Sequence, residues 1–350
     1  MNDNTHLTTC YPGELKMNAY LRTLLLLCSS AWTIGISLGA ASLAQDVKAP
    51  DRKRANVPPA TSRKLTPLPA PTFADVKYGP HERNVLDFWK AESAKPTPVV
   101  VHIHGGGFVG GDKRSFPPQL LQESLSSGIS FASIHYRFVG NGVTFPAPQQ
   151  DGARAIQFLR HKAPEWNIDA KRIAAFGGSA GAGISLWIGF HHDLADPASA
   201  DLVQRQSSRI LAIGSLGGQT TYDPIKIKEL IGGRAWEHPS IFKVYGITTT
   251  DEALHPTPEL RKLYDEASAI THVTKDDPPV FMIYNEPDGD LPPDARPGQG
   301  IHHPRFARLL TPKLDEFGIP WVYRHTNDGK GGDPHREMLE FFKKQFAAVR

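Results

Sequence analysis

The sequence predicts an α/β protein with a mostly parallel central sheet, helices on both faces of that sheet and an inserted lid segment. Short apolar runs of strand type alternate along the chain with segments of helical periodicity. Such regular alternation implies parallel strands joined by helices that cover the sheet. The 350 residues are 40% hydrophobic and 21% charged, which is a globular composition.

Each element follows from a local pattern. The expected strands are continuous apolar runs of buried type, at residues 98–104, 129–136, 172–177, 209–216, 278–284 and 319–325. The expected helices have apolar residues at helical spacing or helix boundary signals, at residues 117–128, 151–162, 180–190, 303–318 and 335–346. Pro312 is expected to break or kink the helix over 303–318, because proline lacks the backbone donor.

The first 44 residues have the character of a secretory signal peptide. Lys16 and Arg22 precede an apolar run that ends at the small-residue sequence Ser42-Leu43-Ala44, and Met17 is a candidate start. An uncleaved anchor is the alternative, because the run is long enough to span a bilayer. We expect cleavage, with export to the periplasm or medium and no stable membrane association afterwards.

Two further features bound the mature chain. Both cysteines, Cys10 and Cys28, lie in the expected signal peptide, so the mature protein would have no disulfide. Residues 45–72 are polar and proline-rich, which predicts a linker before a catalytic domain at 73–350. The net charge of only +3 argues against a nucleic-acid partner.

A serine lies where an expected strand meets an expected helix. The sequence GGSAG at 177–181 has the form Gly-x-Ser-x-Gly, which places a serine on a tight turn with its hydroxyl at the sheet edge. A helix N-cap is the simpler interpretation of Ser179. The strand-turn-helix setting favours a nucleophile instead.

A nucleophilic serine needs a base and an orienting carboxylate, which follow it in the chain in this architecture. Asp288 follows the strand at 278–284 and is the expected acid, with Asp290 as its rival. His335 lies in the loop before the last helix and is the expected base. His325 also follows the strand at 319–325, but it precedes the glycine-rich loop.

The glycine-rich sequence HIHGGGFVGGDKR at 102–114 follows an early strand. Glycines there expose backbone N–H groups, which are the donors that stabilise a carbonyl oxyanion in acyl transfer. We expect the donors to be Gly106, Gly107 and Ala180. Phosphate-loop spacings are not met. His102 and His104 share a strand face, yet no further ligand has suitable spacing, so we expect no metal and no cofactor.

HGGGF at 104–108 together with GGSAG at 177–181 resembles the α/β-hydrolase esterases of the hormone-sensitive-lipase and bacterial carbohydrate-esterase type. The stretches 135–160 and 167–182 are also similar to this family. The resemblance covers roughly residues 73–350. It implies a serine carboxylesterase with a Ser-His-Asp triad, acting on a small-molecule or oligosaccharide ester. A lipase-like member usually has an acidic residue at Gly178, so its absence favours an acetylesterase.

Two segments depart from a simple pattern. GDLPPDARPGQGIHH lengthens the chain after Asp288 and leaves the position of the acid less defined. Residues 217–277 form a lid-like insert, whose Trp236, Phe242 and Tyr245 either line an acyl or sugar pocket or pack the insert onto the body. A serine peptidase or amidase, a longer-chain lipase-like esterase and an inactive binding domain are the alternative functions.

Overall fold

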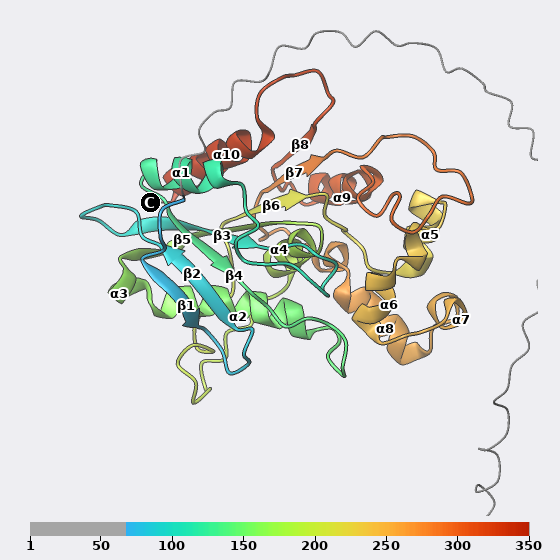
Figure 1. Ribbon diagram of the computed structural model, residues 1–350, viewed down its shortest axis with the longest axis horizontal. Coiled ribbons are helices and arrows are strands. Elements are labelled where there is room, and N and C mark those ends of the chain that lie inside the picture. The colour runs from blue at the N-terminus through green and yellow to red at the C-terminus, as the bar shows by residue number, and fades with distance from the viewer. Residues whose placement is uncertain (1–67, 350) are drawn as a thin grey trace, which may run out of the picture. The chain divides into compact units, whose positions relative to one another are not determined.

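The computed structural model describes residues 68–349, and they contain an eight-stranded sheet with helices packed on both faces (Figure 1). The expected signal peptide and most of the expected linker lie outside the described residues. The strand order is β1-β2-β4-β3-β5-β6-β7-β8. Strands β1, β2 and β4 pair antiparallel, whereas all pairs from β4 to β8 are parallel. The sheet is therefore mostly parallel, as the sequence predicts.

The strands lie close to the predicted ranges, with two additional strands at the start. They are β1 (Phe73–Lys77), β2 (Val85–Trp89), β3 (Thr97–Ile103), β4 (Ser130–Ile134), β5 (Ile168–Gly178), β6 (Ala212–Leu216), β7 (Val280–Tyr284) and β8 (Trp321–His325). β1 and β2 were not expected from the sequence. Their antiparallel pairing needs only short connections, so no helix separates them and no β-α alternation marks them.

The helices separate the parallel strands and also fill the insert. They are α1 (Pro118–Ser126), α2 (Ala147–His161), α3 (Ala163–Trp166), α4 (Ala180–Phe190), α5 (Pro224–Ile231), α6 (Pro239–Tyr245), α7 (Thr250–Leu254), α8 (Pro258–Ala267), α9 (Arg305–Glu316) and α10 (Pro334–Ala348), with 3₁₀ turns η1 (Ala235–Glu237) and η2 (Ala269–His272). Helix α9 continues through Pro312, so of the predicted break or kink the break does not occur.

The core consists of two apolar layers, one on each face of the sheet. Along β3, Val99, Val101 and Ile103 belong to the layer under α2, α4 and α9, whereas Val100 belongs to the layer under α1 and α10. This alternation follows from the period of two in a strand, which sends successive side chains to opposite faces. Because both faces are covered, the whole strand is apolar rather than alternating.

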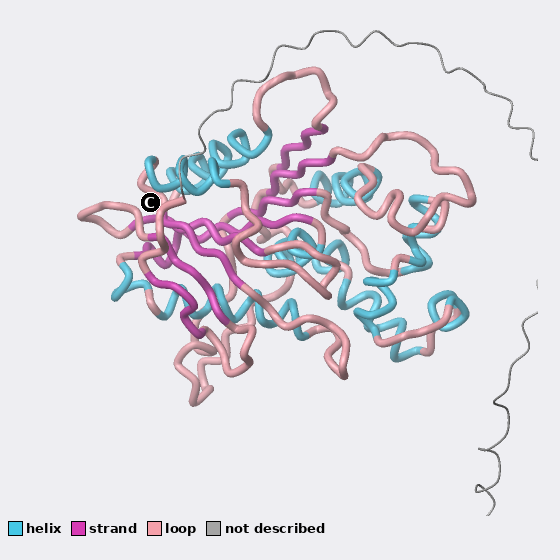
Figure 2. The backbone as a smooth tube through the Cα atoms, in the orientation of Figure 1, coloured by secondary structure: helices cyan, strands magenta, loops and turns pink. Residues whose placement is uncertain are grey.

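Most of the insert is helical and lies between β6 and β7. It contains α5, η1, α6, α7, α8 and η2, which the sequence predicts only as one long segment. The segment from β7 to α9 is a long loop without helix or strand (Figure 2). Both connections leave the carboxyl end of a parallel strand, which is where α/β proteins place their binding sites. None of the helices within residues 68–349 has the length and apolarity needed to cross a membrane.

Candidate active site

Ser179 lies between the end of β5 and the first residue of α4, as the sequence predicts. Its backbone has φ 52° and ψ −119°, a conformation that non-glycine residues rarely adopt. The surrounding strand and helix hold this strain, and its amide donates to the carbonyl oxygen of Leu216 at 2.8 Å. Ser179 takes the N-cap position of α4, but its side chain makes no N-cap hydrogen bond. The hydroxyl is therefore not used to cap the helix.

Glycine at position 181 allows α4 to start directly beside β3. A Cβ atom at Gly181 would lie 2.0 Å from the carbonyl oxygen of Ile103, which is backbone and cannot rotate away. Gly177 has the same constraint, with a Cβ at 2.4 Å from that oxygen. These two glycines therefore set the close approach of β5, α4 and β3 that forms the tight turn around Ser179.

The serine hydroxyl lies within hydrogen-bond distance of His302, a residue that the sequence does not predict as the base. Nε2 of His302 lies 2.8 Å from Oγ of Ser179, and Nδ1 of His302 lies 3.3 Å from a carboxylate oxygen of Glu286. The three side chains thus form a serine–imidazole–carboxylate series. The side chains of His302 and Glu286 are 34% and 23% exposed, and Ser179 and His302 line a cavity.

Side-chain hydrogen bonds fix the loop that carries both His302 and Glu286. Gln219, at the start of the insert, donates from its amide to the carbonyl oxygen of Ile301 at 2.5 Å. Nε2 of His325, at the end of β8, lies 2.8 Å from the carbonyl oxygen of Glu286. Each bond holds the backbone at or next to one member of the series, so the neighbouring strands determine where the imidazole and the carboxylate lie.

The predicted acids do not contact the imidazole. Both carboxylate oxygens of Asp288 accept hydrogen bonds from Arg308 of α9, at 2.5 Å each. This hydrogen bonding holds the pKa of the Asp288 carboxyl below its ordinary value. Asp290 pairs with Arg305 of the same helix. The placement of an aspartate beside the base is therefore corrected to Glu286, because the loop turns the two aspartates toward the arginines of α9.

The predicted base is also placed elsewhere. His335 lies in the first turn of α10, where its Nδ1 is 3.3 Å from a carboxylate oxygen of Asp333, the N-cap residue. The imidazole beside Ser179 belongs to His302 instead. The physical reason is the length of the loop after β7, which returns to the carboxyl end of β5 before α9 begins. The histidine beside Ser179 therefore precedes β8 in the chain rather than following it.

A cavity of about 480 Å³ opens beside the serine hydroxyl. Ser179, His302 and the three predicted oxyanion-hole residues Gly106, Gly107 and Ala180 all line it. Within the described residues, the N–H groups of Gly106 and Gly107 donate to no protein acceptor. Ala180 is the first residue of α4, where an N–H has no partner inside the helix. These three amides are thus available at the place where the sequence expects them.

The loop that carries Gly106 and Gly107 has a backbone conformation that glycine permits. Gly106 has φ 108°, and a Cβ there would lie 2.2 Å from the carbonyl oxygen of Gly110. His104 is fully buried, stacks on Tyr136 at a centroid distance of 4.3 Å, and has Nδ1 2.8 Å from the carbonyl oxygen of Gly105. Burial lowers the pKa of His104 to about 4, so its ring is neutral and acts as a packing and hydrogen-bonding group.

The insert contributes one wall of the cavity through α6 and the residue before it. His238, Ser240 and Lys243 supply polar groups there. Nδ1 of His238 lies 2.6 Å from the Ser240 hydroxyl, and burial, with a smaller contribution from His302, lowers the pKa of His238. The imidazole of His238 therefore favours its neutral form inside the cavity.

The aromatic side chains of the insert serve packing. Trp236 and Tyr245 are buried in the core, and Phe242 packs against it. None of the three lines the cavity beside Ser179. Of the two uses that the sequence leaves open for these residues, the structure supports attachment of the insert to the body.

The chain matches a family model over more than half its length. The model is BD-FAE, and it matches residues 86–295. The chain belongs to the BD-FAE family. The matched region includes β2 to β7, Ser179 and Glu286, and it ends shortly before His302.

Named relatives of this BD-FAE protein are esterases. The probable carboxylic ester hydrolase LipM of Mycobacterium tuberculosis (strain ATCC 25618 / H37Rv) is 26% identical over 222 residues, which are 62% of this chain and 48% of LipM. The chain thus spans about half the length of the curated relatives it matches.

Solved structures share the fold. The acetyl ester-xyloside bifunctional hydrolase from Caldicellulosiruptor lactoaceticus superposes with a TM-score of 0.55 at 24% identity, over 75% of this chain and 84% of that chain. Thermogutta terrifontis esterase 2, in a form phosphonylated by sarin, gives a TM-score of 0.58 at 21% identity, over 80% of this chain and 96% of that chain. The fold is that of the α/β-hydrolases, and the family resemblance predicted from the sequence is confirmed.

Proposed function

We propose that this BD-FAE protein is a serine carboxylic ester hydrolase, with Ser179 as nucleophile, His302 as base and Glu286 as the orienting carboxylate. The observation that carries the proposal is the 2.8 Å contact between Oγ of Ser179 and Nε2 of His302. That distance is within the range for proton transfer between a nucleophile and its base. The esterase names of the relatives, LipM among them, support the same reaction class.

The reaction follows from the positions of these groups. Nε2 of His302 accepts the hydroxyl proton as Oγ of Ser179 attacks the ester carbonyl carbon. The carbonyl electron pair moves to oxygen, which the amides of Gly106, Gly107 and Ala180 stabilise. When the carbon–oxygen bond to the alcohol breaks, His302 returns the proton to the leaving alcohol. Water then attacks the acyl-serine by the same steps and releases the carboxylic acid.

Glu286 acts through the imidazole. Its carboxylate, 3.3 Å from Nδ1 of His302, favours the tautomer in which Nδ1 carries the proton and Nε2 is free to accept one. It also stabilises the imidazolium that forms during attack. A glutamate reaches one methylene further than an aspartate, which suits a residue held two positions beyond the end of β7.

The proposed substrate is a short-chain ester, with acetyl on a carbohydrate as the first choice. The cavity volume of about 480 Å³ and its polar wall at His238, Ser240 and Lys243 support an alcohol part that carries hydroxyl groups. The similarity to an acetyl ester-xyloside hydrolase points in the same direction. The export expected from residues 1–44 would bring the enzyme to such esters outside the cytoplasm.

The test is a series of p-nitrophenyl esters of increasing acyl length, together with acetylated xylan and an aminoacyl amide. Highest kcat/KM at acetyl or propionyl, with acetate released from xylan, supports the proposal. A maximum at eight carbons or longer would assign the longer-chain alternative, and amide cleavage faster than ester cleavage would assign a peptidase. Ser179→Ala is the control: it should retain the far-ultraviolet circular dichroism spectrum and lose turnover in every assay.

A further inference from the structure

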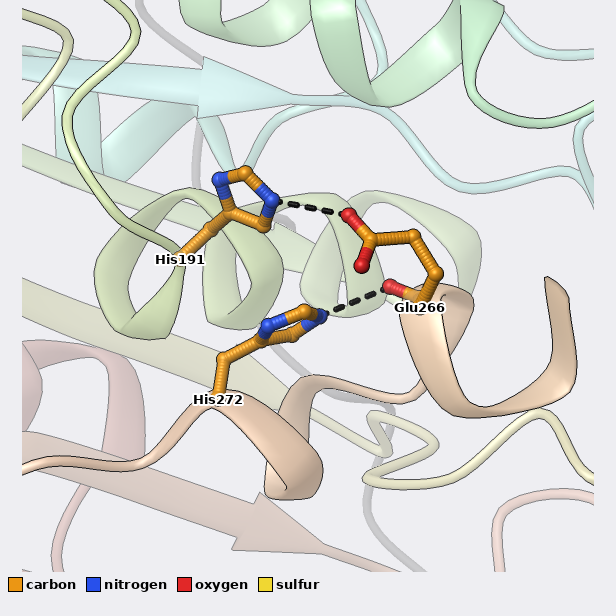
Figure 3. Close-up of side chains that lie close together, drawn as sticks. All are labelled: His191, Glu266 and His272. Carbon is orange, nitrogen blue, oxygen red and sulfur yellow. Dashed lines mark hydrogen bonds and ion pairs between the residues drawn. The ribbon is translucent and has the colours of Figure 1, made fainter. Parts of the chain in front are cut away.

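Two histidines and a glutamate from distant parts of the chain meet at the far end of α4 (Figure 3). His191 directly follows α4, Glu266 lies in α8, and His272 ends the 3₁₀ turn η2. One candidate ligand atom from each residue lies within 4.8 Å of the other two. The sequence spacing of these residues matches no metal motif, so only the fold brings them together.

The ring of His191 faces two hydrogen-bond acceptors, whereas a neutral imidazole has only one N–H donor. Nε2 of His191 lies 2.9 Å from a carboxylate oxygen of Glu266, and Nδ1 lies 3.1 Å from the carbonyl oxygen of His192. Both neighbours are acceptors, so both ring nitrogens need a hydrogen, whereas a neutral imidazole has one. The side chain is only 4% exposed, so a neutral ring here would direct a nitrogen lone pair at an oxygen lone pair with little water to separate them. A cation bound at Nε2 would remove that conflict.

We propose that His191, Glu266 and His272 bind a divalent transition-metal ion, with zinc the best match to the donors. Imidazole nitrogen and carboxylate oxygen are ordinary zinc ligands, at about 2.0–2.2 Å from the metal. Tetrahedral geometry then requires about 3.4 Å between donor atoms. Rotation of the Glu266 side chain, which is 48% exposed, can widen its present 2.9 Å separation from Nε2 of His191 to that value, and three protein ligands leave a position for water.

The contact between His191 and the His192 carbonyl matches this assignment. Metal-binding histidines usually donate the N–H of the other ring nitrogen to a carbonyl or carboxylate, which fixes the tautomer and orientation of the ring. Here Nδ1 of His191 would donate to that carbonyl, and Nε2 would bind the ion. The ring is also held between neighbouring groups, stacked on Trp187 at a centroid distance of 4.0 Å.

The position of the site indicates that a bound metal would link the insert at 217–277 to the body of the protein. Glu266 and His272 belong to the insert at 217–277, which also supplies the cavity wall on α6. His191 belongs to the body, at the end of the helix that begins beside Ser179. A metal at this junction would attach the insert to the body. Besides the contact between His191 and the Glu266 carboxylate, the Trp187 indole donates a hydrogen bond of 2.9 Å to the carbonyl oxygen of Glu266 there.

The test is titration of chelator-treated protein, prepared without a polyhistidine tag, with Co²⁺ and then Zn²⁺. We expect one Co²⁺ per chain with the strong visible absorption of tetrahedral coordination, its displacement by Zn²⁺, and a rise in melting temperature of roughly 5 °C at saturation. Absence of both the absorption and the rise would overturn the proposal.

Matched variants locate the ion. Glu266→Gln preserves side-chain size but provides a poorer ligand, and His272→Ala removes one ligand; each should weaken Co²⁺ binding at least tenfold. His255→Ala is the control, because His255 is an exposed histidine of the same insert whose side chain pairs with Asp251. Equal loss of binding in all three variants, or in none, would refute the assignment. The readouts do not depend on turnover, so they stand apart from the proposed esterase reaction.

Discussion

Replacing His302 by alanine tests the corrected base directly. Its Nε2 is the hydrogen-bond partner of the Ser179 hydroxyl among the described residues, so His302→Ala leaves the nucleophile without a base. The matched control is His335→Ala, at the position that the sequence predicted. His335 contacts Asp333 at the start of α10, and its side chain is 37% exposed.

The expected loss follows from the geometry. General-base catalysis contributes about 10²–10⁴-fold, and removal of a residue that acts together with the nucleophile costs more than that alone. His302 is 34% exposed, so water can enter the space left by the ring and accept the proton inefficiently. We therefore expect kcat/KM to fall about 10³- to 10⁴-fold, or about 4–5.5 kcal/mol of transition-state stabilisation.

The assay is initial-rate hydrolysis of p-nitrophenyl acetate by both variants, with thermal melts to confirm folding. His335→Ala should stay within about twofold of the unchanged protein, since exposed substitutions away from the site have small effects. A folded His302→Ala variant that retains more than a tenth of the original kcat/KM would refute the assignment. A large loss in His335→Ala alone would restore the prediction made from the sequence.

Two further predictions concern the carboxylates and the buried histidines. Glu286→Gln should lower kcat about 10²- to 10³-fold in the same assay, through loss of the orienting charge, whereas Asp288→Asn should change it less than threefold, and the reverse order would contradict the corrected acid. Burial, with a smaller contribution from His104, lowers the pKa of His102 to about 3. Histidine in the unfolded chain takes up its proton near pH 6.5, whereas the folded ring stays neutral down to about pH 3. The free energy of unfolding should therefore decrease as the pH is lowered from about 6.5 to about 3, by up to ~1.4 kcal/mol per pH unit. Urea denaturation at several pH values should show a smaller slope for His102→Gln, and an unchanged slope would count against the buried neutral ring.

Much of the fold could be predicted from the sequence because the decisive elements are local. The strand at 172–177, the helix at 180–190 and GGSAG between them are each defined by neighbouring residues, and the structure has β5, Ser179 and α4 in these places. The position of the Gly106 and Gly107 amides could likewise be predicted, because it depends on the glycines of their own loop. Backbone conformation at a tight turn depends on which residues lack a Cβ, and sequence displays that directly.

The partners of Ser179 could not be predicted in the same way, because they depend on where a long loop returns. The order of residues along the chain after the expected strands predicts Asp288 and His335. Glu286 and His302 satisfy the same order, Ser then acid then His, but both lie between β7 and α9. The available signal was the pair of histidines at the end of GDLPPDARPGQGIHH, a segment too long for an ordinary connection.

The shift of the base to an earlier loop also explains the position of His325. If the imidazole beside Ser179 came from the segment after β8, the end of that strand would have to position this segment close to Ser179. Here β8 instead ends in His325, whose Nε2 holds the carbonyl oxygen of Glu286 at 2.8 Å. The strand thus supports the acid through the backbone, while Gln219 supports the base through Ile301. The reaction requires the hydroxyl, the imidazole and the carboxylate to meet at the carboxyl ends of β5, β6 and β7. A long loop that is held by hydrogen bonds from Gln219 and His325 can place the last two groups there as well as a strand end can.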